Sequence, residues 1–139
     1  LPDTIPTHFG ASGTADDWGS KSTISIFPAM AVSLYVLTSA LNAWFAVVKD
    51  PKSLINLPVE MKARLTDAQA EEVRTFISRC LFAMKTVIEG MMAYLVYMTI
   101  QVANGKASSL GIYFFLFLGA ILAIAGLMVW KSLKLMFAA

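Results

Sequence analysis

Three long runs of apolar residues dominate the chain and are separated by shorter polar segments. The first run, 24–48, and the third, 110–130, contain no charged residue. Each is long enough to cross a bilayer as a helix, which takes roughly 20 residues. The second run, 76–102, is as long but includes Arg79 near its start, and Lys85 and Glu89 within its apolar stretch 80–102. The pattern predicts an all-α integral membrane protein with three transmembrane helices, forming a single membrane domain over 1–139.

The segment before the first run, 1–23, is polar and rich in turn-forming residues. Pro2 and Pro6 hold their neighbours extended, and glycines at three further positions permit turns. We therefore expect an ordered loop without a helix, lying outside the cytoplasm.

The segment between the first two runs, 49–75, predicts a loop followed by the start of a helix. Thr66 and Asp67 are typical N-cap residues, and nothing interrupts the helical pattern from there to Val102. One helix should therefore extend beyond the membrane. Asn104-Gly105 predicts the turn before the third span, and 131–139 forms the tail.

Composition agrees with the membrane class: 58% of the residues are hydrophobic, 14% are charged, and the mean hydropathy is +0.67. Soluble domains contain about 25% charged residues. The net charge of +2 and the lack of a basic cluster give no indication of nucleic-acid binding. A single cysteine, Cys80, cannot form an internal disulfide.

Basic residues are distributed unevenly between the two sides of the predicted membrane domain. Cytoplasmic segments of membrane proteins carry an excess of Lys and Arg. The richer side holds Lys49, Lys52, Lys62, Arg64, Arg74, Arg79, Lys131 and Lys134, and the other holds Lys21 and Lys106. This predicts an external N-terminus and a cytoplasmic C-terminus in a bacterial cytoplasmic membrane. Because no signal peptide is present, we also expect a further helix ahead of Leu1.

Glu89 is the most informative residue for function, since it falls near the middle of the second span. A charge at that depth costs about 2.5–3.5 kcal/mol, so it must be protonated, paired or next to a wet cavity. Lys85 lies on the same helical face, one turn earlier. One hypothesis is a structural ion pair, joined by Asn42, Thr38 or Ser39. The other is a proton or ion relay, or a polar contact with a partner.

Two further features suggest contacts rather than chemistry. Gly119, Ala123 and Gly126 are small residues that favour a close helix–helix contact, either internal or with a partner. His8 is the one histidine, and the acidic residues near it lack the spacing of a metal site. No catalytic pattern and no cofactor motif is present, so we predict a protein that is not an enzyme.

The leader, LPDTIPTHFGASGTADDWGSKSTISIFP, resembles the signature of a bacterial membrane domain of unknown function, which also forms the N-terminal half of the SdpI family of toxin-immunity proteins. The resemblance implies that the leader lies outside the cytoplasmic face, and that the protein is related to those that protect a cell from its own secreted toxic peptide. The matching positions are Leu1-Pro2, Ile5-Pro6, His8-Phe9, Gly13, Asp17, Gly19, Lys21 and Pro28.

Three functions follow as hypotheses. The first is ligand binding or an immunity-like role through the external loop, where His8, Asp17, Trp18 and Lys21 are the candidate residues. We expect His8, Trp18 and Lys21 to fold that loop onto the outer ends of the spans. The second is an accessory subunit that stabilises a larger membrane complex, with other subunits or a second copy as partner besides the lipid bilayer. The third is a small transporter component using Glu89.

Overall fold

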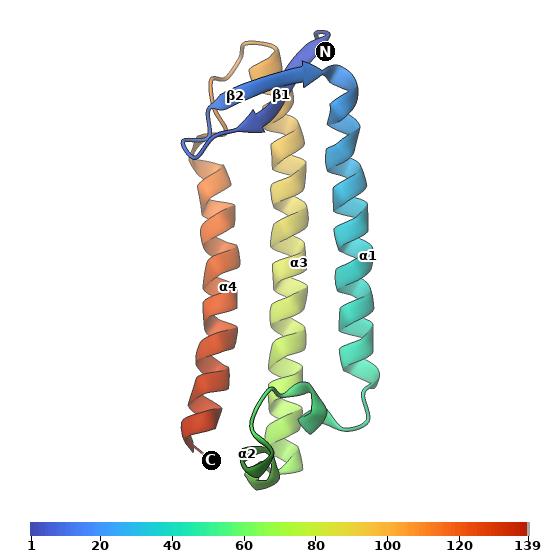
Figure 1. The fold of residues 1–139 in the computed structure, drawn as a ribbon, viewed down its shortest axis with the longest axis vertical. Helices are drawn as coiled ribbons and strands as arrows, with labels where there is room; N and C mark the ends of the chain where they lie inside the picture. Colours follow the sequence, from blue (N-terminus) through green and yellow to red (C-terminus); the bar gives the residue numbers. More distant parts are fainter. Residues whose placement is uncertain (139) are drawn as a thin grey trace.

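The computed structural model describes residues 1–138 and is mostly helical, with three long helices side by side (Figure 1). The central helix, α3, packs against α1 on one side and α4 on the other, so the three form a flat layer. A small β-sheet lies across one end of this layer, and α2 lies at the other end. The elements are β1 (Thr4–Phe9), β2 (Ala15–Ser20), η1 (Lys21–Ser25), α1 (Ile26–Val47), η2 (Pro51–Leu54), α2 (Val59–Arg64), α3 (Asp67–Ala103) and α4 (Gly111–Ala138).

The prediction of three membrane-crossing helices is confirmed. Lys21–Val47, Asp67–Ala103 and Gly111–Lys131 are each long and apolar enough to cross a bilayer. Large apolar side chains on all three remain exposed within the chain, Val36, Phe82 and Leu122 among them. Lipid can cover such side chains, which explains how a layer one helix thick exists without an extensive core of its own.

The 37-residue helix α3 is continuous, as the sequence predicts. It begins with a capping box, in which the Thr66 hydroxyl accepts a hydrogen bond from the Gln69 backbone N–H and the Gln69 side chain accepts one from the Thr66 N–H. The helix ends at Ala103, and Asn104 is its C-cap residue. Gly105 follows with a φ of 69°. This left-handed conformation suits the sharp turn toward α4.

The loop before α3 packs against that helix. Ile55, Leu57 and Leu65 are buried together with Ala70 and Val73 of α3. Because these apolar loop residues cover the first turns of α3, they give the end of the layer opposite the β-sheet its own small hydrophobic core.

The sequence prediction was wrong for the leader. The leader contains two β-strands and is not an irregular loop, so the protein is not all-α. Strands β1 and β2 form an antiparallel hairpin, and η1 leads from it into α1. Gly10 and Gly13 close the turn: the Gly10 N–H donates to the Thr14 carbonyl at 2.9 Å, and Gly13 has a φ of 76°. The hairpin was hidden in the sequence because its prolines and glycines are typical of loops. It is stabilised by contacts with residues far along the chain.

Candidate functional site

The inner side of the hairpin is fixed to the ends of the helices. Ile5 is fully buried, and β1 packs against α3. The Leu110 N–H donates to the Gly13 carbonyl at 2.8 Å, which joins the hairpin turn to the connection between α3 and α4. The Tyr94 hydroxyl of α3 in turn donates to the Leu110 carbonyl at 2.6 Å. The hairpin is therefore a fixed cap on the layer.

These contacts correct the expectation that His8, Trp18 and Lys21 fold the leader onto the helix ends. The side chain of His8 is 68% exposed and Trp18 is 49% exposed. The residues that do fix the leader are Ile5 and Leu110, which sequence reasoning missed. The neighbouring residues Ile5 and Pro6 are both buried, so β1 lacks the alternation of apolar and polar residues that predicts a strand with one buried face.

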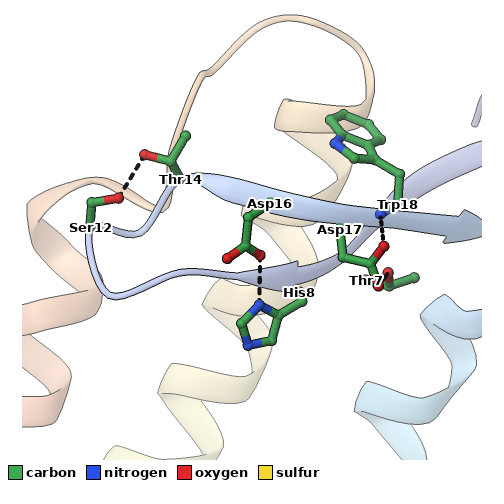
Figure 2. Close-up of polar contacts among 7 residues, drawn as sticks. All are labelled: Thr7, His8, Ser12, Thr14, Asp16, Asp17 and Trp18. Carbon is green, nitrogen blue, oxygen red and sulfur yellow. Dashed lines mark hydrogen bonds and ion pairs between the residues drawn. The ribbon is translucent and has the colours of Figure 1, made fainter.

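The hairpin carries a group of exposed polar side chains (Figure 2). The His8 Nδ1 lies 2.6 Å from Oδ1 of Asp16 on the neighbouring strand. Asp17 accepts hydrogen bonds from the Thr7 hydroxyl at 3.3 Å and from the Trp18 backbone N–H at 2.9 Å. The ring of Trp18 lies on the opposite side of β2 from the Asp17 carboxylate. The hairpin thus presents an acidic surface and an exposed indole on a fixed backbone.

Lys21 lies apart from this group and closes the open end of the hairpin. Its Nζ donates to the Asp3 carboxylate at 2.8 Å, and its backbone N–H donates to the Asp3 carbonyl at 2.9 Å. Both contacts hold the two strand ends together. Lys21 therefore has a structural role at the point where the chain enters α1.

In the middle of the layer, Lys85 and Glu89 do not form the predicted ion pair. The Lys85 ammonium donates to the Ser39 hydroxyl of α1 at 3.2 Å and lies 4.5 Å from the centre of the Tyr35 ring. Lys85 therefore joins α3 to α1. Of the three polar residues proposed to join it, the structure brings Ser39 into contact.

Glu89 lies instead in an apolar groove between α1 and α3. The groove has a volume of about 360 Å³ and is lined by Phe27, Pro28 and Ala31 of α1 and by Met92, Ala93 and Val96 of α3. The Glu89 Oε1 atom is buried, and no group among residues 1–138 hydrogen-bonds to it. Since an unpartnered polar atom in an apolar setting is costly, this oxygen needs a proton or an external partner.

The small residues of α4 do not make the internal contact that was one of their two predicted roles. Gly119, Ala123 and Gly126 are exposed, and a methyl group added at either glycine would meet nothing within 4 Å. The close approach of α3 to α4 occurs at Gly90, where an added methyl group would lie 3.2 Å from the Phe117 ring. Gly119, Ala123 and Gly126 therefore remain candidates for contact with a partner.

Comparisons with known proteins agree with the resemblance in the leader. Residues 1–32 match the family described as a domain of unknown function, DUF1648. The matched segment contains the hairpin, η1 and the first turns of α1. No solved structure matches the chain.

The chain is also similar to an uncharacterised protein from Archaeoglobus fulgidus, with 36% identity over 59 residues. The match covers 42% of this chain and 32% of the relative, so the chain spans about a third of the length of that protein. These comparisons show that the leader is similar to DUF1648, while the three long apolar helices support a membrane protein.

Proposed function

We propose that this chain is a non-enzymatic membrane protein that binds a cationic ligand, such as a basic peptide, on the exposed side of its hairpin. The observation that carries the proposal is the fixed, exposed array of Asp16, Asp17 and His8 beside Trp18. A rigid array loses little conformational entropy when a ligand binds. The family match covers the same hairpin, so the proposed binding surface lies in the segment that this chain shares with that family.

The charge of the hairpin supports a cationic ligand. Over 1–21, three carboxylates stand against one lysine, and that lysine already pairs with Asp3. Asp16 and Asp17 remain exposed. The Trp18 ring offers a second contact for a cation, because the faces of indole rings attract ammonium and guanidinium groups.

The proposed topology places the hairpin outside a bacterial cytoplasmic membrane and the C-terminus in the cytoplasm. It rests on the excess of Lys and Arg at the opposite end of the layer. In this orientation the hairpin meets ligands that arrive from outside the cell, which would suit an immunity-like role against a secreted peptide. Labelling of introduced cysteines tests it: Ser12→Cys and Ser108→Cys should react from outside, and Ser53→Cys should not.

Binding of a labelled oligolysine peptide to the protein in nanodiscs of neutral lipid tests the function. Asp16→Asn and Asp17→Asn should each weaken binding by up to about fivefold, as expected for an exposed charge pair. Glu60→Gln is the matched control, because Glu60 is an exposed carboxylate at the other end of the layer. An equal loss in the control would reduce the effect to net charge and contradict the proposal.

A second candidate function, assembly with a larger membrane complex, is favoured by the unpartnered Glu89 oxygen. A Lys or Arg on a partner helix would neutralise that carboxylate inside the groove. A partner protein that co-purifies with the wild type in mild detergent should then be lost from the Glu89→Gln variant. It should still co-purify with Met92→Leu, a variant in the same groove. If instead Glu89→Gln abolishes a pH-dependent ion flux in proteoliposomes, the transport hypothesis replaces this one.

A further inference from the structure

A second groove lies between α1 and α3, at the end of the layer opposite the hairpin. It has a volume of about 530 Å³, and most of the residues that line it are polar, unlike those of the Glu89 groove. Hydroxyl, amide and guanidinium groups face it from both helices, and an aromatic ring adjoins them. The residues that matter here are Asn42, Arg74, Thr75, Ser78, Arg79 and Phe82.

The two arginines of this groove differ in what they contact. Arg74 is fully engaged: its guanidinium donates to the Glu71 carboxylate at 3.2 and 2.5 Å and to the Val48 carbonyl of the α1 end at 3.1 Å. Arg79 is exposed, and no described residue pairs with its guanidinium. The groove therefore carries one uncompensated positive charge.

The depth of the groove matches the boundary between hydrocarbon and lipid headgroups. Arg79 directly precedes the apolar stretch 80–102 of α3, and Asn42 lies about one and a half turns before the end of α1. Phe82, which is 60% exposed, continues the groove toward the apolar part of the layer. A long Arg side chain at this depth extends toward the headgroups.

We infer that this groove binds the phosphate of an anionic phospholipid, with Arg79 supplying the charge. A guanidinium offers several N–H donors that match phosphate oxygens, and Thr75, Ser78 and Asn42 supply further donors around it. An acyl chain then lies along Phe82. Basic pockets between membrane helices are typical sites for acidic headgroups.

The state of Glu71 argues against a preference for zwitterionic lipids. A choline or ethanolamine headgroup brings a positive charge that would need a negative charge in the groove. Glu71 is the carboxylate of the lining, and its ion pair with Arg74 already compensates its charge. The groove thus offers an uncompensated positive charge to the phosphate and no uncompensated negative charge to the ammonium.

The test measures lipid retention by native mass spectrometry of the purified chain, with phosphatidylglycerol or phosphatidylcholine added in mild detergent. The wild type should retain phosphatidylglycerol in preference, and Arg79→Gln should reduce its retention by about fivefold, the effect of one basic residue near an acidic headgroup. Ser78→Ala should give a smaller loss in the same direction. Lys106→Gln is the control, since it removes the same charge at the other end of the layer and should change nothing.

Three outcomes would overturn the inference. Equal retention of the two lipids by the wild type would show that the groove does not distinguish headgroups. An equal loss in Arg79→Gln and Lys106→Gln would trace the effect to net charge. Competition by inorganic phosphate at the concentration of the lipid would show that the groove takes a free phosphate, without need for the acyl chain along Phe82.

Discussion

The two ends of the helical layer are closed in different ways. At one end a β-hairpin is joined to the helices by backbone hydrogen bonds and by the buried side chains of Ile5 and Leu110. At the other end the loop before α3 is held by a small apolar core and by the ion pair of Lys52 with Asp67 at 2.9 Å, while Lys131 of α4 pairs with Glu72 of α3 at 2.6 Å. Backbone contacts fix a surface without using its polar side chains. The hairpin end therefore leaves Asp16, Asp17 and Trp18 available for a ligand, whereas the other end uses much of its charge on itself.

The largest loss of stability should come from Ile5, the fully buried residue of β1. Ile5→Ala should destabilise this end by about 2–5 kcal/mol, because the change leaves a cavity at a completely buried position. Hydrogen exchange should then accelerate in 4–20 and stay slow in 55–65. Leu57→Ala is the matched control and should give the reverse pattern. If either variant loosens both ends equally, the ends are not independent units.

A smaller loss of stability should come from a change in the backbone of the hairpin turn. Gly13 has a φ of 76°, in the left-handed region. Gly13→Ala should cost about 1–2 kcal/mol, because a residue with a Cβ rarely adopts that conformation. Loss of this turn also weakens the Gly13 contact with Leu110, so thermal stability in detergent should fall. Gly119→Ala, where the added methyl group meets nothing, should not lower it. An unchanged melting temperature in Gly13→Ala would contradict the role given to this turn.

The middle of the layer should behave as two independent sites. Because Lys85 contacts Ser39 and Glu89 has no partner in the described chain, changes at 85 and 89 should be additive. We expect a coupling energy below about 0.5 kcal/mol in a double-mutant cycle of Lys85→Met and Glu89→Gln. Thermal unfolding of the two single variants and the double variant measures it. A coupling above about 1 kcal/mol would restore the predicted ion pair.

The smallest loss of stability should come from the partly exposed ion pair of Lys131 with Glu72, at the end opposite the hairpin. Lys131→Gln should lower the melting temperature only slightly, and the difference should vanish in high salt, which screens exposed charges. The hydrogen bond from Lys131 also lowers the pKa of Glu72, which lies ahead of the apolar stretch, from its ordinary value of 4.5. The contribution of the pair is therefore complete above that ordinary value and is lost as the pH falls through the lowered pKa. A difference that persists in high salt would mean that Lys131 acts through packing on Phe76.

The three spans and the start of α3 could be predicted because their signals are local. An apolar run is sufficient for a span in lipid, and the capping box of Thr66 and Gln69 lies within one helical turn. The hairpin could not be predicted in this way. Its strands depend on Ile5 packing against α3 and on a backbone bond to Leu110, which lies far along the chain.

In the candidate site, too, local features could be predicted from the sequence and contacts between helices could not. Spacing correctly placed Lys85 and Glu89 one turn apart on α3, but spacing does not show which helix packs beside them. Once α1 lies against α3, the Ser39 hydroxyl and the Tyr35 ring accept the Lys85 ammonium. Glu89 then needs a proton or an external partner, because no group among residues 1–138 hydrogen-bonds to its buried oxygen.

The continuity of α3 has a mechanical consequence. The helix has 37 residues. At the rise of an α-helix it is therefore about 55 Å long, and it resists bending, so it moves as a lever. The hairpin is attached near the C-terminal end of α3 through Tyr94 and Leu110. The small hydrophobic core of the loop before α3 is attached at the N-terminal end of the same helix. A force that tilts the hairpin would therefore be transmitted along α3 to the small hydrophobic core at its opposite end.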